Sequence, residues 1–321
     1  MREVAGCWLR VAGSTIASVK RGFVRILFVL CLLASLVACQ KSPEKRFSGP
    51  RALQHVKAQC AFGPRPVGSA ANRRTGDYIA RVLKDNGWEV EFQDFSELGL
   101  PVRNVIGKKG QGPVTILGAH YDTRPVADRD PLDRTQPIMG ANDGGSGTAV
   151  LLELSRVLGS TATDSAQIWL AFFDAEDRGE LNNWAWCVGS QYMADHLFET
   201  AEGQPPKERP RLVIIADMVG GSEQHFYYDW YSSLSLQERL WQIAAEKGYQ
   251  EHFTPEHRYS VYDDHVPFAN LGIPAAVIVD LDYAYWHTRD DTLDKISADS
   301  LQRVGDILET YIEGRRDNEN R

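Results

Sequence analysis

Four short apolar segments, each followed by acidic or histidine residues, constrain the fold of this chain more than any other feature. They lie at residues 114–119, 168–173, 212–216 and 275–279, and each is rich in Val, Ile, Leu, Ala or Phe. Runs of this length, bounded by polar residues or glycine, are typical of strands buried on both faces of a sheet. Residues 90–95 alternate like a further strand, and helical spacing occurs at 71–86, 148–158, 234–247 and 299–312. The alternation predicts an α/β fold, a doubly wound, mostly parallel mixed sheet with helices on both faces.

The residues that follow these predicted strands indicate where a functional site would lie. In open α/β sheets, ligands bind outside the carboxyl ends of the strands. Imidazole and carboxylate groups delivered to one such rim are typical ligands of a divalent metal. The residues at or shortly after the four strand ends are His120, Asp122, Glu176, Asp177, Asp217 and His287.

Taken singly, each of these residues has an ordinary structural explanation. Asp143, within the glycine-rich segment 140–147, could be a turn or capping residue, and the Lys-Ser/Thr of a phosphate-binding loop is absent there. Glu176 and Asp177 are neighbours that point in different directions, so one can bind a metal while the other acts as a base. Two histidines and three carboxylates with one further glutamate suit zinc, and their joint occurrence favours a metal centre.

The order of these residues resembles the family of co-catalytic zinc aminopeptidases, which also contains the glutaminyl cyclases. The resemblance extends from about residue 52 to about residue 315. In the aminopeptidases it implies that Asp143 bridges two zinc ions. It further implies that His120 and Asp217 complete one site, that Asp177 and His287 complete the other, and that Glu176 is the general base.

Two segments resemble the cyclase branch of this family more closely. Trp286-His287-Thr288 is similar to the cyclase Trp-His-Thr, and Asp263-Asp264-His265 is similar to the cyclase Asp-Asp-His. Asp177 stands where animal cyclases carry a second glutamate. A tryptophan or tyrosine in such a segment can equally be a packing residue.

The cyclase resemblance implies a different reaction on the same frame. Zinc held by Asp143, Asp177 and His287 would polarise the side-chain amide of an N-terminal glutamine. Glu176 would take a proton from the α-amino group and pass it to departing ammonia. Asp217 and Asp263 would form an acidic network around Glu176, and Trp286 would offer the substrate a flat wall.

Three functional hypotheses follow. The first is a zinc-dependent glutaminyl-peptide cyclotransferase that converts N-terminal glutamine of peptides and proteins to pyroglutamate and releases ammonia. The alternative is a two-zinc aminopeptidase that hydrolyses N-terminal residues from peptides. A non-catalytic binding protein on the same fold is disfavoured because no ligand position has been lost. We expect one zinc ion or two, peptide or protein N-termini as partners, and a monomer.

The first residues predict export. Basic residues end at Arg25, and a short apolar run leads to Leu36-Val37-Ala38-Cys39, which resembles a bacterial lipobox. We expect a lipoprotein signal peptide at 1–38, lipidation of Cys39, a tether at 39–51 and a single zinc-dependent catalytic domain at 52–321. Simple cleavage nearby and a short buried helix are the alternatives. Gln40 favours the periplasmic face or outer membrane, with a lipid as the only membrane anchor.

Charge and cysteine content exclude two classes of protein. The formal net charge is −8, and the basic residues of the signal would leave with it, so the remainder is a poor binder of nucleic acid. The chain has no CxxC or paired Cys/His spacing, which excludes a structural zinc finger. Cys60 and Cys187 remain after export, and the sequence leaves open whether they form a disulfide.

Overall fold

The structure is a computed structural model that describes residues 46–158, 166–198 and 209–319. The predicted signal peptide at 1–38, the lipidation site Cys39 and the first part of the tether lie outside the described residues.

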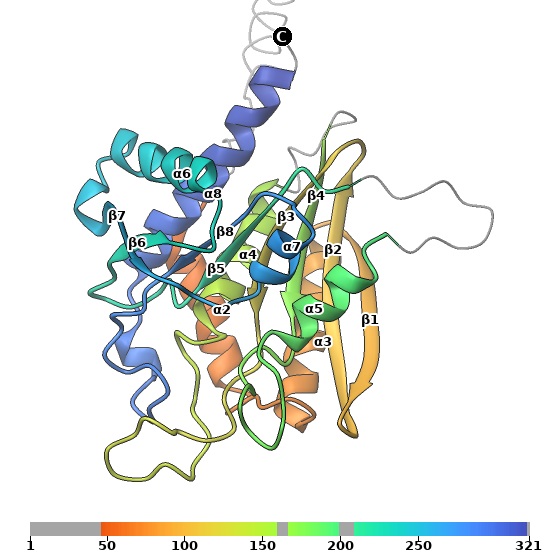
Figure 1. The fold of residues 1–321 in the computed structure, drawn as a ribbon, viewed down its shortest axis with the longest axis vertical. Helices are drawn as coiled ribbons and strands as arrows, with labels where there is room; N and C mark the ends of the chain where they lie inside the picture. The colour runs from red at the N-terminus through yellow and green to blue at the C-terminus, as the bar shows by residue number, and fades with distance from the viewer. Residues whose placement is uncertain (1–45, 159–165, 199–208, 320–321) are drawn as a thin grey trace, which may run out of the picture. The chain divides into compact units, whose positions relative to one another are not determined.

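A mixed, mostly parallel sheet forms the centre of the described fold, as predicted, and it has six strands (Figure 1). The strand order is β1-β2-β4-β3-β5-β8, and β4, β3, β5 and β8 run parallel to one another. β1 and β2 are antiparallel, and β2 is antiparallel to β4. The strands are β1 (Glu89–Glu97), β2 (Leu100–Gly110), β3 (Val114–His120), β4 (Gln167–Phe173), β5 (Leu212–Asp217) and β8 (Ala275–Val279).

Helices cover both faces of the sheet, which confirms the predicted doubly wound arrangement. α5 and α7 pack on the face opposite to the other helices, and each face has its own hydrophobic core. One core takes side chains from α2 (Gly49–Cys60), α3 (Ala70–Asp85), α4 (Ser146–Leu158), α6 (Leu234–Glu246) and α8 (Ala298–Glu319). The other takes side chains from α5 (Val188–Asp195) and α7 (Val266–Asn270).

The parallel strands supply both cores because successive side chains of a strand point to opposite faces. On β5, for example, Ile214 packs in the first core and Ile215 in the second. Both side chains are buried. A strand buried on both sides therefore reads as a continuous apolar run, which is why these strands are predictable from the sequence.

Three strands differ from the expectation. The sequence does not predict β2, because Pro101, Gly107 and two lysines make it read as polar, yet it pairs along its length with β1. A separate two-stranded parallel sheet is formed by β6 (Phe226–Asp229) and β7 (Phe253–Tyr259). Short 3-10 helices occur at η1 (Gln250–His252) and η2 (Leu293–Lys295).

The folded unit begins before residue 52, so the tether is shorter than predicted. α2 starts at Gly49, and the compact unit begins at Arg46. The Phe47 side chain is buried, and a Cβ added to Gly305 would lie 2.2 Å from its ring. Residues 46–51 therefore belong to the folded unit, because Phe47 completes the core beside α8.

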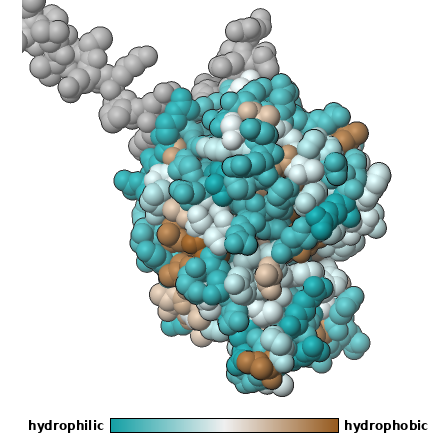
Figure 2. All heavy atoms as spheres, turned by 90° about the vertical axis from the view of Figure 1, so that its left-hand side faces the viewer, coloured by the Kyte–Doolittle hydropathy of each residue, from teal (hydrophilic) through white to brown (hydrophobic). Residues whose placement is uncertain are grey.

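A membrane-spanning helix must be both long and predominantly apolar. None of the described helices is both long and apolar enough to cross a bilayer. On the face that Figure 2 shows, most residues are hydrophilic and hydrophobic residues form small, separate groups.

Candidate active site and metal centre

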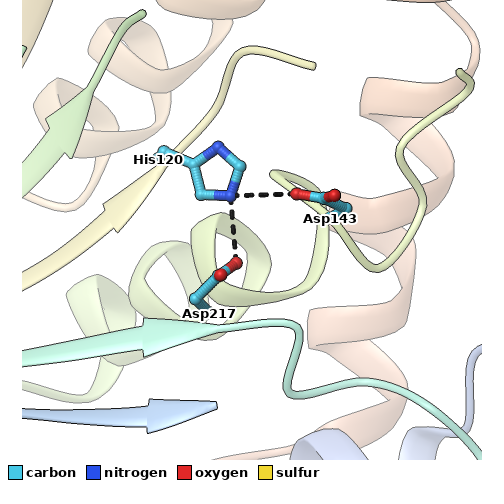
Figure 3. A group of neighbouring side chains, drawn as sticks. All are labelled: His120, Asp143 and Asp217. Carbon is cyan, nitrogen blue, oxygen red and sulfur yellow. Dashed lines mark hydrogen bonds and ion pairs between the residues drawn. The ribbon is translucent and has the colours of Figure 1, made fainter. Parts of the chain in front are cut away.

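Three elements bring His120, Asp143 and Asp217 together at the carboxyl rim of the sheet (Figure 3). His120 is the last residue of β3, Asp217 is the last residue of β5, and Asp143 lies in the turn before α4. The Nε2 atom of His120 is 2.9 Å from Asp217 Oδ1 and 3.3 Å from Asp143 Oδ1. The two carboxylates thus meet at one imidazole nitrogen.

Glycine allows the turn that carries Asp143 to approach the strands. Gly144 has a positive φ of 78°, and a Cβ there would lie 2.1 Å from the backbone oxygen of Asp122. At Gly147 a Cβ would lie 1.9 Å from the backbone oxygen of Ala216. The start of α4 therefore packs directly against the ends of β3 and β5, and this contact sets the position of Asp143.

A second group shares Asp143 with the first. It consists of Asp143, Asp177 and His287, whose ligand atoms lie within 4.8 Å of one another. His287 Nε2 is 3.2 Å from Asp177 Oδ1 and 3.6 Å from Asp143 Oδ2. One oxygen of Asp143 thus faces His120 and the other faces His287, the geometry of a bridging carboxylate.

Two further buried carboxylates fix the loops that carry these groups. Asp122 accepts hydrogen bonds from the backbone N–H groups of Glu176 and Asp177, each at 3.1 Å. Asp291 accepts hydrogen bonds from the backbone N–H groups of Asn142 and Asp143 at 2.9 and 3.1 Å. The predicted place of Asp122 beside His120 is correct, since its Oδ1 lies 3.5 Å from His120 Nδ1. No pattern in the sequence predicts the contacts of Asp291.

The backbone beside the site adopts a conformation that non-glycine residues rarely take. Ala175, Met218 and His287 have positive φ values of 59°, 46° and 57°. Each precedes or follows a strand-end carboxylate or is itself a candidate ligand. Left-handed backbone at non-glycine positions costs about 1–3 kcal/mol and clusters at functional sites.

A pocket of about 230 Å³ opens onto the candidate metal centre. Its floor is polar and carries Asp143, Glu176, Asp177, Asp217, Asp263 and His287. Its walls are mostly apolar and are formed by Trp186, Met218, Ser260, Val261, Tyr262, Val279, Leu281 and Trp286. The pocket therefore combines a carboxylate-rich floor with an aromatic wall.

The electrostatics of the floor favour a bound cation. Burial, followed by the charge of Asp143, raises the pKa of Asp177 to about 7. Burial lowers the pKa of His287, but Asp177, Asp128 and Asp143 together raise it to about 9. Both carboxylate oxygens of Asp177 and one oxygen of Asp143 are buried without a hydrogen-bond partner. Buried carboxylates with unused lone pairs that converge on imidazole nitrogens fit a divalent metal.

The structure brings together all the residues predicted for the metal centre and its pocket. Both histidines and the three predicted carboxylate ligands form the two groups, and Glu176, Asp263 and Trp286 line the same pocket.

Cys60 and Cys187 are both free thiols, and Cys187 donates a weak hydrogen bond from Sγ to Glu176 Oε1 at 3.5 Å.

Sequence reasoning misses two residues that contact the second group. Asp128 Oδ1 lies 3.1 Å from His287 Nδ1, and Arg124 Nη1 lies 3.6 Å from Asp177 Oδ1. Both lie in an irregular segment that has no periodic pattern, and their partners are far away along the chain. No signal in a single sequence joins them.

Known proteins that are similar to this chain belong to a family of metal-dependent peptidases and cyclases. Residues 104–312 match the model of peptidase family M28. The crystal structure of Porphyromonas gingivalis glutaminyl cyclase superimposes with a TM-score of 0.77 at 34% identity, covering 84% of this chain and 99% of that one.

Two curated proteins from different branches are also similar to the chain. Aminopeptidase YwaD of Bacillus subtilis (strain 168) is 30% identical over 75% of this chain, which spans only 52% of YwaD. A glutaminyl-peptide cyclotransferase-like protein of Mus musculus is 27% identical, covering 77% of this chain and 71% of the mouse protein. With the family match, the fold and the strand-end site in agreement, the chain belongs to peptidase family M28, in which it is a glutaminyl cyclase-like member.

Proposed function

We propose that this protein is a zinc-dependent glutaminyl-peptide cyclotransferase, an acyltransferase that converts N-terminal glutamine of peptides and proteins to pyroglutamate. The observation that carries the proposal is the pocket, in which Glu176 and Asp263 share a floor with the ligand group while Trp286 forms a wall. The similarity to Porphyromonas gingivalis glutaminyl cyclase supports the same activity.

Asp143, Asp177 and His287 would hold the zinc ion. When bound, zinc polarises the side-chain amide of the substrate as a Lewis acid. The carboxylates of the floor also make the pocket attractive to the positive charge of a peptide N-terminus.

Glu176 is placed to move the proton in this reaction. Burial raises the pKa of Glu176 well above its usual range, and the charges of Asp177, Asp264 and Asp263 add to the rise. A carboxylate with a raised pKa accepts a proton readily near neutral pH. Glu176 takes a proton from the α-amino nitrogen as that nitrogen bonds to the side-chain amide carbon. The same proton then passes to the amide nitrogen, which leaves as ammonia when its bond to carbon breaks.

Asp217 and Asp263 complete the acidic surroundings of Glu176. Burial raises the pKa of Asp263 well above its usual range, and Asp217 and Asp264 raise it further. A carboxyl group that holds its proton can donate a hydrogen bond within such a cluster. We assign Asp263 this role beside Glu176, with Asp217 as a further acidic group of the same pocket floor.

A two-zinc aminopeptidase is the second candidate, and one observation favours it. The ligand atoms of His120, Asp143 and Asp217 also lie within 4.8 Å of one another, so the residues present fit a second metal. In that reaction Glu176 would take its proton from water, and the amide of the first peptide bond would be hydrolysed. The similarity to YwaD supports this candidate.

Replacing Trp286 by Ala is expected to raise the KM for a peptide that begins with glutamine by about tenfold, because the pocket loses a large aromatic surface from its wall. Ammonia release from that peptide measures the effect. Trp230→Ala is the matched control, since Trp230 is 63% exposed and lies outside the pocket lining. Its KM should stay within about twofold of the original value. An equal change in both variants, or no ammonia release by the zinc-loaded protein, would contradict the proposal.

We also propose, from the sequence, that the protein is exported, anchored by lipid on Cys39 and active as a monomer at the periplasmic face or outer membrane. Mass spectrometry of the membrane-bound protein tests the anchor. A mature chain that begins at an unmodified residue would rule it out.

A further inference from the structure

The segment 124–130 contacts the chain around His287 through three consecutive residues. Asp128 Oδ1 lies 3.1 Å from His287 Nδ1, and the backbone N–H of Arg129 donates to the backbone oxygen of His287 at 3.3 Å. Asp130 accepts hydrogen bonds from the backbone N–H and the Nε of Arg289 at 3.0 and 3.2 Å. The segment therefore holds His287 at its ring, at its own backbone oxygen and through Arg289, two residues further along the chain.

The Arg129 side chain extends this contact to the pocket wall. Its guanidinium carbon lies 3.7 Å from the centroid of the Trp286 ring, a cation–π contact. The same short segment thus contacts both the candidate ligand His287 and the tryptophan beside it.

Arg124 connects the segment to the other side of the same ligand group. Its Nε and Nη2 donate to Asp128 Oδ2 at 2.8 and 2.5 Å, and its side chain is 4% exposed. Its Nη1 donates to the backbone oxygens of Asp177 and Gly179 at 3.4 and 3.3 Å. One buried guanidinium therefore joins the carboxylate behind His287 to the backbone of Asp177.

The contacts around His287 offset the free-energy cost of its backbone conformation. The φ of His287 is 57°, in the left-handed region that non-glycine residues seldom adopt and that costs free energy unless neighbouring contacts stabilise it. The ring nitrogen that faces Asp128 is the one that does not face Asp143 and Asp177. A carboxylate on the second nitrogen fixes the ring orientation and the tautomer, leaving Nε2 free to bind a metal.

We propose that Asp128, held by Arg124, is a positioning residue for the ligand group Asp143–Asp177–His287. It acts on that group and not on His120–Asp143–Asp217, whose histidine has Asp122 on its second nitrogen instead. The inference rests on the proposed function for one point, namely that the metal is zinc.

The test is the zinc affinity of the metal-stripped full chain, measured by competition with a chromophoric chelator. Asp128→Ala should weaken binding by about 10–100-fold, the range found for removal of groups that orient metal ligands. Asp128→Asn should lose less, because an amide oxygen can occupy the same place beside His287 Nδ1 but carries no charge. Asp133→Ala is the matched control on the same loop, because Asp133 is only partly buried, accepts hydrogen bonds from the backbone N–H and the hydroxyl of Thr135, and belongs to neither ligand group.

Combining Asp128→Ala with a substitution of either histidine distinguishes a positioning role from a general structural role. In the His120→Ala background Asp128→Ala should keep its full effect, because the affected ligand group remains. In the His287→Ala background it should change the remaining zinc affinity by less than about twofold. Equal losses in both backgrounds, or an unchanged affinity in folded Asp128→Ala, would overturn the proposal. Wild-type protein that binds zinc but releases no ammonia would contradict the proposed function and leave this inference standing.

Discussion

Glu176→Gln is expected to lower kcat for cyclisation by about 10²–10⁴-fold while zinc binding is retained. Glutamine has nearly the same size and still accepts hydrogen bonds, but it cannot take a proton from the α-amino group. Glu176 belongs to neither of the two ligand groups, so the metal content should not change. Ammonia release gives the rate, and elemental analysis of the purified variant gives the zinc content.

The control for this prediction is Glu180→Gln. Glu180 lies four residues further along the same loop and is exposed, so the same substitution there should leave kcat within about twofold. Full activity in Glu176→Gln would reject both the cyclase and the aminopeptidase mechanisms, since each assigns the proton transfer to this residue. Loss of zinc together with activity would reassign Glu176 as a ligand.

Asp143→Ala is expected to remove zinc and to lower activity by at least about 10³-fold, because it takes one ligand from each of the two groups. Its two oxygens face different histidines, so no neighbouring carboxylate can replace it in both places. Elemental analysis and ammonia release measure the two effects. Asp133→Ala is the control: Asp133 is only partly buried and lies outside both ligand groups, so this variant should retain zinc and activity.

Because Asp143 belongs to both ligand groups, substituting each histidine in turn shows which group is needed for activity. If the protein is a cyclase, we expect His287→Ala to abolish cyclisation, because His287 contacts Asp177 and belongs to the proposed zinc-binding group. We expect His120→Ala to impair cyclisation less, because His120 contacts Asp217 and belongs to the other group. An Asp143→Ala variant that keeps one zinc and normal turnover would contradict the role of the bridging carboxylate.

The parts of the fold and site that are predictable from the sequence share a physical cause. Strands buried on both faces carry continuous apolar runs, so β3, β4, β5 and β8 are visible in the sequence. Residues at their carboxyl ends must lie at one rim, so the sequence alone places His120 and Asp217 together. His287 lies further from the end of its strand, β8, which ends at Val279, so its prediction depends more on the Trp286-His287-Thr288 motif.

The parts that the sequence does not predict depend on contacts without a local pattern. β2 is stabilised by pairing with β1 and β4, and its own residues are partly polar. Phe47 falls within the predicted tether because one aromatic residue in a polar tract gives no periodicity, yet it packs against α8. Asp128 contacts His287 because the loop after β3 folds back to the site. A single sequence has no pattern that predicts the path of this loop.

The most direct test of the account is product analysis by mass spectrometry of two peptides incubated with the zinc-loaded protein. One peptide begins with Gln and the other with Leu, and they are otherwise identical. The account predicts that the first loses one ammonia and keeps all its residues, while the second is unchanged. Stepwise loss of N-terminal residues from either peptide would contradict the cyclase and establish the aminopeptidase, in which Trp286 is a packing residue.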